Sequence, residues 1–201
     1  KIMINSISRE LNSIAIPHYE GETSMLPFDL SDLMTLPIEF RETAKEMIKN
    51  LPNKIGEAFL TVHGKFVKKA NTLRRGAPHI DGNFLESLKW GSGGGGNGWK
   101  IGENGSQLNT IEHKLSYENE KGGMLIASNY SSSKGWNGNF KGKAGIGGDC
   151  RHIELGEGFK LDANKVYYGN SQFIHESLPL DKDIHRVMYR ITLPMNHEPL
   201  N

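Results

Sequence analysis

The sequence predicts a mainly β protein of the α+β class, in which an antiparallel sandwich or barrel follows an N-terminal helical segment. One observation behind this prediction is an apolar stripe of helical period within residues 37–51. The other is a period-two pattern from residue 58 onward, followed by short strand-like segments between Gly, Asn and Asp turns. At 201 residues the chain fits a single domain, 1–201. We expect residues 1–57 to form a helical or irregular buttress and residues 58–194 to form the β core.

Composition excludes several classes of protein. The formal net charge of +1 gives no electrostatic case for nucleic acid or membrane as an obligate partner. The single cysteine, Cys150, excludes an intrachain disulfide and suits a reducing compartment. No stretch approaches the roughly 20 apolar residues of a membrane span, and the first 20 residues lack the apolar core of a secretory signal. We therefore expect a cytoplasmic protein, although the chain opens on Lys1 rather than Met, so this expectation covers only the printed residues.

The N-terminal third contains one clear element. Residues 1–35 mix apolar and polar positions without a clear period, whereas Pro37 suits the first turn of a helix. The apolar residues after it lie at spacings of four, three, one and three, which places them on one face of an amphipathic helix: Phe40, Ala44, Met47, Ile48 and Leu51. We expect this helix to pack on a sheet and to carry no chemistry.

The period changes to two over residues 58–67, which predicts a strand. Neither face of this strand is purely apolar, so we expect one face to line a cavity that contains His63 or Lys65. Further short strands are predicted at residues 110–117, 123–129, 152–155, 165–168, 172–175 and 187–193.

Two Gly-rich stretches are predicted to be loops. Residues 91–98 read as a flexible loop, or as a lid whose Trp90 or Trp99 closes over substrate. The polar stretch 131–148 is longer than a usual connection, and such loops are often functional. We expect loops 91–105 and 131–148 to form the mouth of any substrate site.

Two distant segments carry residues suited to one metal site. His79 and Asp81 lie two residues apart after Pro78, which is expected to hold Ala77 extended, and His175 lies far along the chain. Side chains two apart on an extended segment point to the same side. Two His and one Asp can cap one face of Fe(II) and leave the opposite face open.

Two arginines follow the late histidine. Arg186 and Arg190 share one face if residues 187–193 and those before them form a strand, so both can point inward. A guanidinium can hold a buried carboxylate through two parallel hydrogen bonds.

Each of these residues also has a structural explanation. His79 and Asp81 suit a simple turn with an Asx hydrogen bond, and His175 suits a satisfied core position. The arginines suit surface pairing with Glu176, Asp181 or Asp183. Cys150 lies between Asp149 and Arg151, so it is either a buried structural residue or an activated thiol.

The ordered set of His79-x-Asp81, His175 and Arg186 resembles the Fe(II)/2-oxoglutarate-dependent dioxygenase superfamily, and the resemblance covers about residues 58–194. It implies a double-stranded β-helix (jelly-roll) for those residues. It also implies Fe(II) on His79, Asp81 and His175, and 2-oxoglutarate as co-substrate. Arg186 would be the main 2-oxoglutarate clamp, because of its spacing from His175, with Arg190 as a second clamp or its replacement.

The resemblance implies hydroxylation of a substrate C–H bond with release of succinate and CO2. The substrate is a small molecule or peptide that the sequence does not identify, and the oligomeric state is equally open. One alternative is a cupin-like metalloenzyme that uses no 2-oxoglutarate. Another is a non-catalytic jelly-roll module for carbohydrate or another ligand, in which Trp90, Trp99 and Trp136 stack on that ligand.

Overall fold

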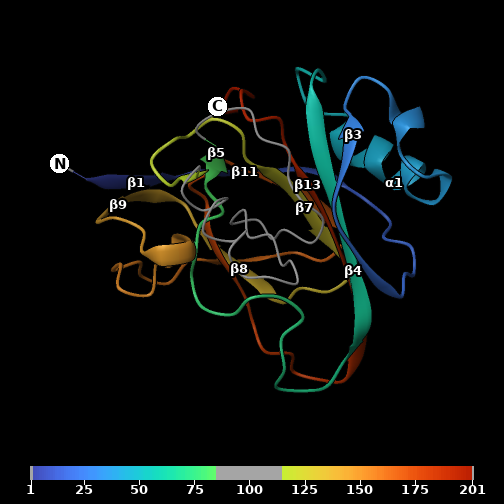
Figure 1. Ribbon diagram of the computed structural model, residues 1–201. Helices are drawn as coiled ribbons and strands as arrows, with labels where there is room; N and C mark the ends of the chain where they lie inside the picture. The colour runs from blue at the N-terminus through green and yellow to red at the C-terminus, as the bar shows by residue number, and fades with distance from the viewer. Residues whose placement is uncertain (1, 85–114, 201) are drawn as a thin grey trace, which may run out of the picture.

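The computed structural model describes residues 2–84 and 115–200, and over these residues the protein is mainly β with antiparallel sheets (Figure 1). The largest sheet has six strands in the order β2-β11-β7-β13-β4-β3. In chain order, its strands are β2 (Ser8–Ser13), β3 (Gly21–Asp29), β4 (Glu57–Val67), β7 (Met124–Ser128), β11 (Lys165–Gly169) and β13 (Ile184–Thr192).

Smaller sheets lie beside it. A three-stranded sheet has the order β10-β8-β12, and two strand pairs, β1-β9 and β5-β6, complete the described β structure. Their bounds are β1 (Met3–Ser6), β5 (Asn83–Phe84), β6 (Leu115–Ser116), β8 (Ser133–Trp136), β9 (Gly138–Lys141), β10 (Phe159–Leu161) and β12 (Ile174–Ser177). Two short 3-10 helices are η1 (Leu33–Thr35) and η2 (Ile146–Gly148).

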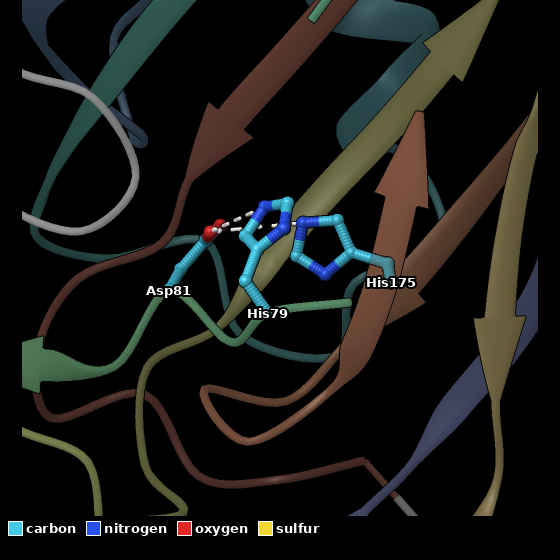
Figure 2. Close-up of side chains that lie close together, drawn as sticks. All are labelled: His79, Asp81 and His175. Atoms are coloured by element: carbon cyan, nitrogen blue, oxygen red, sulfur yellow. Dashed lines mark ion pairs between the residues drawn. The ribbon is translucent and has the colours of Figure 1, made fainter. Parts of the chain in front are cut away.

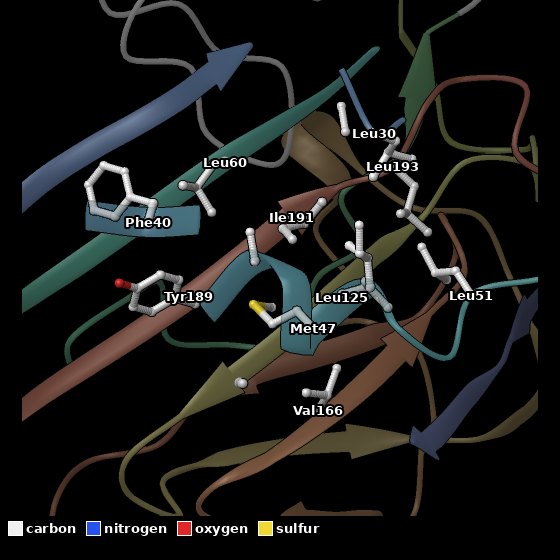
Figure 3. Close-up of a cluster of buried hydrophobic side chains, with 14 of the residues drawn as sticks. Leu30, Phe40, Met47, Leu51, Leu60, Leu125, Val166, Tyr189, Ile191 and Leu193 are labelled. Atoms are coloured by element: carbon white, nitrogen blue, oxygen red, sulfur yellow. The ribbon is translucent and has the colours of Figure 1, made fainter. Parts of the chain in front are cut away.

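The helix predicted within residues 37–51 is confirmed as α1 (Ile38–Ile48). Its buried side chains, among them Phe40 and Met47, join one cluster with buried residues of the six-stranded sheet such as Leu60 and Tyr189 (Figure 3). The helix therefore covers one face of that sheet. None of the helices in the described part of the chain is long and apolar enough to cross a membrane.

Strand β13 has two different faces. Tyr189 and Ile191 belong to the apolar cluster under α1. Because side chains alternate along a strand, Arg186 and Arg190 point to the other side of the sheet. Arg186 there donates hydrogen bonds to hydroxyl groups on three other strands, which come from both sheets: Ser128, Ser133 and Ser177. The three-stranded sheet thus faces the six-stranded sheet on the side opposite α1.

Most of the strand predictions are confirmed with small shifts of their ends. Residues 58–67, 123–129 and 165–168 correspond to β4, β7 and β11. The prediction for residues 187–193 corresponds to β13, which begins three residues earlier, and that for 172–175 corresponds to β12, which begins and ends two residues later. Most of the predicted strand 110–117 lies outside the described residues.

Two local predictions are wrong. Residues 152–155 form a turn, a bend and irregular backbone rather than a strand, and the predicted loop 131–148 contains strands β8 and β9. The Gly, Asn and Ser content of 131–148 disfavours strands, but cross-strand pairing decides the outcome. Strand β8 lies between β10 and β12, and β9 pairs with β1. Residues 1–35 likewise lacked a clear period, yet they contribute β1, β2 and β3.

Helix α1 offers a matched test of this packing. Met47 is fully buried under the sheet, whereas Ile38 on the same helix is 79% exposed. We expect Met47→Ala to lower the free energy of unfolding by about 2–4 kcal/mol, because it removes buried contacts and leaves a cavity. Ile38→Ala should change it by less than about 0.5 kcal/mol. Urea unfolding followed by circular dichroism measures both, and equal losses would contradict this placement of the helix.

Candidate metal centre

A two-residue antiparallel bridge brings the two histidines together. The backbone N–H of His79 donates to the carbonyl of His175 at 3.1 Å, and the N–H of His175 donates to the carbonyl of His79 at 3.1 Å. Residues that exchange both hydrogen bonds lie directly opposite each other, with side chains on the same side. The two imidazole centroids accordingly lie 4.4 Å apart, although the residues are far apart in the sequence.

Asp81 completes the group because it follows His79 by two residues on the same extended segment. Figure 2 shows its carboxylate pointing toward both rings. Its Oδ1 lies 3.6 Å from Nε2 of His175 and 4.0 Å from Nε2 of His79. One ligand atom from each of the three residues lies within 4.8 Å of the others.

The backbone also orients both imidazoles. Nδ1 of His79 lies 2.9 Å from the carbonyl oxygen of Ala77, and Nδ1 of His175 lies 2.8 Å from that of Phe173. A carbonyl oxygen only accepts, so each Nδ1 carries the proton and donates it. Each Nε2 then presents its lone pair toward Asp81. This arrangement fixes both tautomers in the form that binds a metal.

The spacing of the three ligand atoms fits a divalent cation. Ligands in adjacent positions around an octahedral ion at about 2.1 Å lie about 3 Å apart. The distances of 3.6 and 4.0 Å between the carboxylate and the imidazoles exceed this by no more than about 1 Å. The ligand atoms of the two imidazoles lie within 4.8 Å of each other, so we expect side-chain rotations to close the group around one ion and leave its other positions free.

The electrostatic environment favours the ligand forms of His79 and Asp81. Burial, with a smaller contribution from the adjacent His175, lowers the pKa of His79 to about 3. The burial of Asp81 alone would raise its pKa, but neighbouring groups, with the guanidinium groups of Arg190 and Arg74 among them, outweigh that effect and hold its pKa below the usual value. A neutral imidazole and an ionised carboxylate are the states that bind a cation.

Local backbone geometry positions His79. Ala77 has φ of 69°, in the left-handed region, so the expectation that Pro78 holds it extended is wrong. That conformation costs a non-glycine residue about 1 kcal/mol or more, and such residues often occur at functional sites. Gly82, just after Asp81, has φ of 75°, and a Cβ there would lie 2.7 Å from the ring of Tyr117. Only glycine fits this position without displacement of the ring.

The three residues open onto a cavity of about 130 Å³ between the two sheets. Besides apolar and hydroxyl groups, its walls carry guanidinium and carboxylate groups. The charged residues are Arg74, Arg75, Arg186, Arg190, Asp81 and Glu176.

Arg186 lies in this cavity and is 1% exposed. Its Nε, Nη1 and Nη2 donate to hydroxyls of Ser128, Ser177 and Ser133 at 3.1, 3.2 and 3.0 Å. Burial lowers its pKa to about 10, and the charge of Arg74 adds to the shift. Neutral hydroxyls orient the guanidinium without neutralising it.

Surface pairing of the two late arginines is therefore excluded, since Arg186 and Arg190 are 1% and 5% exposed. Asp181 instead accepts a hydrogen bond from Tyr130, and Asp183 accepts one from the backbone of Lys69. Within the described residues, neither arginine forms an ion pair with a carboxylate.

Other predicted residues have different outcomes. His63 lies beside the cavity, with its Nδ1 3.4 Å from Nη1 of Arg74. Trp136 is buried in an apolar cluster with Ile4 and Ile174, and its indole N–H donates to Gly156, so it does not offer a free face for a ligand. Trp90, Trp99 and loop 91–105 lie outside the described residues.

Sequence reasoning missed Arg74 and the serines around Arg186. Arg74 belongs to a basic cluster that reads as a solvated surface, yet its side chain is 25% exposed and lines the cavity. Ser128 could have indicated this site from the sequence. A serine on an otherwise apolar strand such as β7 needs a hydrogen-bond partner when it is buried, which indicates a polar group on that face of the strand.

Comparisons of the chain with models of protein families, with curated proteins and with solved structures found no match. The candidate metal centre therefore rests on the geometry of His79, Asp81 and His175 alone.

We expect a divalent cation to stabilise the protein through this centre. Mn(II) at about 100 times its dissociation constant should raise the melting temperature by roughly 5–10 °C, because it binds only the folded chain. Asp81→Asn should abolish the shift, whereas Asp162→Asn, at a 63% exposed side chain, should retain it. Differential scanning fluorimetry with and without EDTA measures this. An undiminished shift in Asp81→Asn would contradict the assignment.

We also expect Cys150 to be unreactive in the native protein. Its thiol is fully buried, and burial raises its pKa to about 12, with the charge of Asp149 adding to the shift. Alkylation by iodoacetamide at pH 8 should be at least about 100-fold slower in the folded chain than in urea, because only the thiolate reacts. Mass spectrometry follows the reaction, and rapid labelling of the folded chain would indicate an activated thiol.

Proposed function

We propose that the protein is an Fe(II)- and 2-oxoglutarate-dependent dioxygenase that hydroxylates a substrate C–H bond and releases succinate and CO2. The observation that carries this proposal is the presence, in one cavity, of two imidazoles and a carboxylate around a common point together with a buried guanidinium that has no carboxylate partner among the described residues. The two sheets that enclose the cavity support a jelly-roll of the double-stranded β-helix type.

His79, Asp81 and His175 would hold the iron. Three protein ligands on one face leave positions for a bidentate keto acid and for dioxygen. When bound, the iron supplies the activation of dioxygen, and the protein supplies position and a protected cavity. The two backbone carbonyls that hold the Nδ1 protons keep both rings aimed at the ion.

Arg186 would hold the distal carboxylate of 2-oxoglutarate. Its partner Ser177 lies two residues after His175 on β12, a rise of about 6.6 Å along the strand. The rise between His175 and Ser177 is similar to the length of the five-carbon chain of 2-oxoglutarate. One end of that chain could therefore lie at the metal ligands and the other end at Arg186. The serine hydroxyls leave the charge of Arg186 available to a carboxylate.

Anaerobic titration with Fe(II) and 2-oxoglutarate tests the proposal directly. We expect a visible charge-transfer band of the keto-acid chelate, and succinate formation after dioxygen is admitted. His79→Ala and Asp81→Ala should abolish both signals, because each removes a ligand. Metal binding without this band and without a response to 2-oxoglutarate would instead support a cupin-like metalloenzyme.

Arg186→Gln separates the clamp from the metal centre. We expect it to raise the dissociation constant of 2-oxoglutarate by about 10–100-fold, because it removes charge-assisted hydrogen bonds of about 1.5–3 kcal/mol. The affinity for Mn(II), used in place of Fe(II), should remain within about threefold. Calorimetry measures this constant first and then the constant for 2-oxoglutarate on the Mn(II)-loaded protein. An unchanged affinity for 2-oxoglutarate would exclude Arg186 as the clamp.

A non-catalytic module that stacks its ligand on tryptophans is less well supported, because Trp136 is 4% exposed and belongs to the core. Such a module would keep its ligand affinity after removal of metal.

A further inference from the structure

A second guanidinium in the cavity has no strong acceptor among residues 2–84 and 115–200. Arg190 is 5% exposed, and its Nη2 donates to the hydroxyl of Thr61 at 3.3 Å and to the sulfur of Met25 at 3.7 Å. Its Nε has no hydrogen-bond partner within the described part of the chain. A buried, charged donor left in this state destabilises the folded chain. The cavity that it lines therefore suits an anion.

Arg74 adds a second positive group to the same wall. Its Nη1 lies 3.4 Å from Oε2 of Glu22 and 3.4 Å from Nδ1 of His63. Burial lowers the pKa of Arg74 to about 10, and the charge of Arg190 contributes to that shift, which reflects how close the two guanidinium groups lie. The half-exposed Glu22 is a weak counter-ion for the pair.

This site is distinct from that of Arg186. The two arginines lie four residues apart on β13, about 13 Å along the strand, with Met188 between them. Their partners are also different, since Arg186 is held by three serine hydroxyls and Arg190 by Thr61. The hydrogen bonds of Arg186 thus lead toward β7, β8 and β12, whereas those of Arg190 lead toward β3 and β4, so we expect each guanidinium to hold its own anion.

The charges of the cavity also favour more than one anion. Its walls carry four guanidinium groups and two carboxylates, those of Asp81 and Glu176. A divalent cation on Asp81 increases the positive excess, and one dianion at Arg186 offsets only part of it. An unbalanced charge in a partly dry cavity is costly, so a further anion is favoured.

We propose that Arg190, with Arg74, forms a second oxyanion subsite, and that the substrate hydroxylated here carries a carboxylate, sulfonate or phosphate group. The assignment of this anionic group to the substrate rests on the proposed function, whereas the existence of the oxyanion subsite does not. Arg190 grips the anionic group and so presents the rest of the substrate to the open face of the metal centre.

Calorimetric titration of inorganic sulfate into the Mn(II)-loaded protein tests the subsite. With saturating 2-oxoglutarate present, we expect one sulfate per chain, with an affinity within about threefold of that measured without it. Arg190→Gln should weaken sulfate binding at least tenfold and leave the affinity for 2-oxoglutarate within about threefold. Arg186→Gln, on the same face of the same strand, is the matched control and should show the reverse pattern.

The competition between sulfate and 2-oxoglutarate in the wild-type protein tests the proposal even if Arg190→Gln does not fold. Complete displacement of sulfate by 2-oxoglutarate would show a single anion site and overturn the proposal, as would sulfate binding that is unchanged in Arg190→Gln. Failure of 2-oxoglutarate to bind, with sulfate still dependent on Arg190, would overturn the proposed dioxygenase and leave the oxyanion subsite standing.

Discussion

The candidate site depends on one antiparallel bridge, the reciprocal pair of backbone hydrogen bonds between His79 and His175. Those bonds place two side chains from distant parts of the chain side by side without any contribution from the side chains themselves. Asp81 follows from the same geometry, because it lies two residues further along the extended segment. The metal group is thus a consequence of backbone register, and a slip of one residue would turn the histidines away from each other.

Strand β13 connects this site with the stability of the fold. Its outward residues, such as Tyr189 and Ile191, join the apolar cluster under α1, while its inward face carries two arginines. The apolar face therefore supplies the burial that holds two guanidinium groups in a cavity where they would not remain on their own. Hydroxyl groups from both sheets solvate Arg186 without cancelling its charge, which keeps that charge available for a ligand.

The excess of positive charge unites the proposals made here. A cavity with four guanidinium groups and two carboxylates favours an anionic ligand over a neutral one, and a cation at Asp81 increases the positive excess. One anionic ligand at Arg186 and another at Arg190 would reduce this positive excess. Cation binding at Asp81 and anion binding at the arginines would then be coupled through the electrostatic potential of the cavity, since each lowers the electrostatic cost of the other.

The sequence by itself determined the elements whose pattern is strong and local. The stripe from Phe40 to Leu51 predicts α1, and the alternation over residues 58–67 predicts β4. It also indicated the ligand group, because His79 and Asp81 share one face at a spacing of two. It could not define β8 and β9, whose Gly, Asn and Ser residues form strands only because partner strands supply their hydrogen bonds.

Only the tertiary structure decided which charges are buried. Arg74 reads as one more residue of a basic, solvated cluster, and Trp136 reads as a possible ligand platform. The fold reverses both expectations: it brings Arg74 to the cavity wall and buries Trp136 among apolar side chains. Burial depends on which distant strands come together, and no local spacing in the chain encodes that.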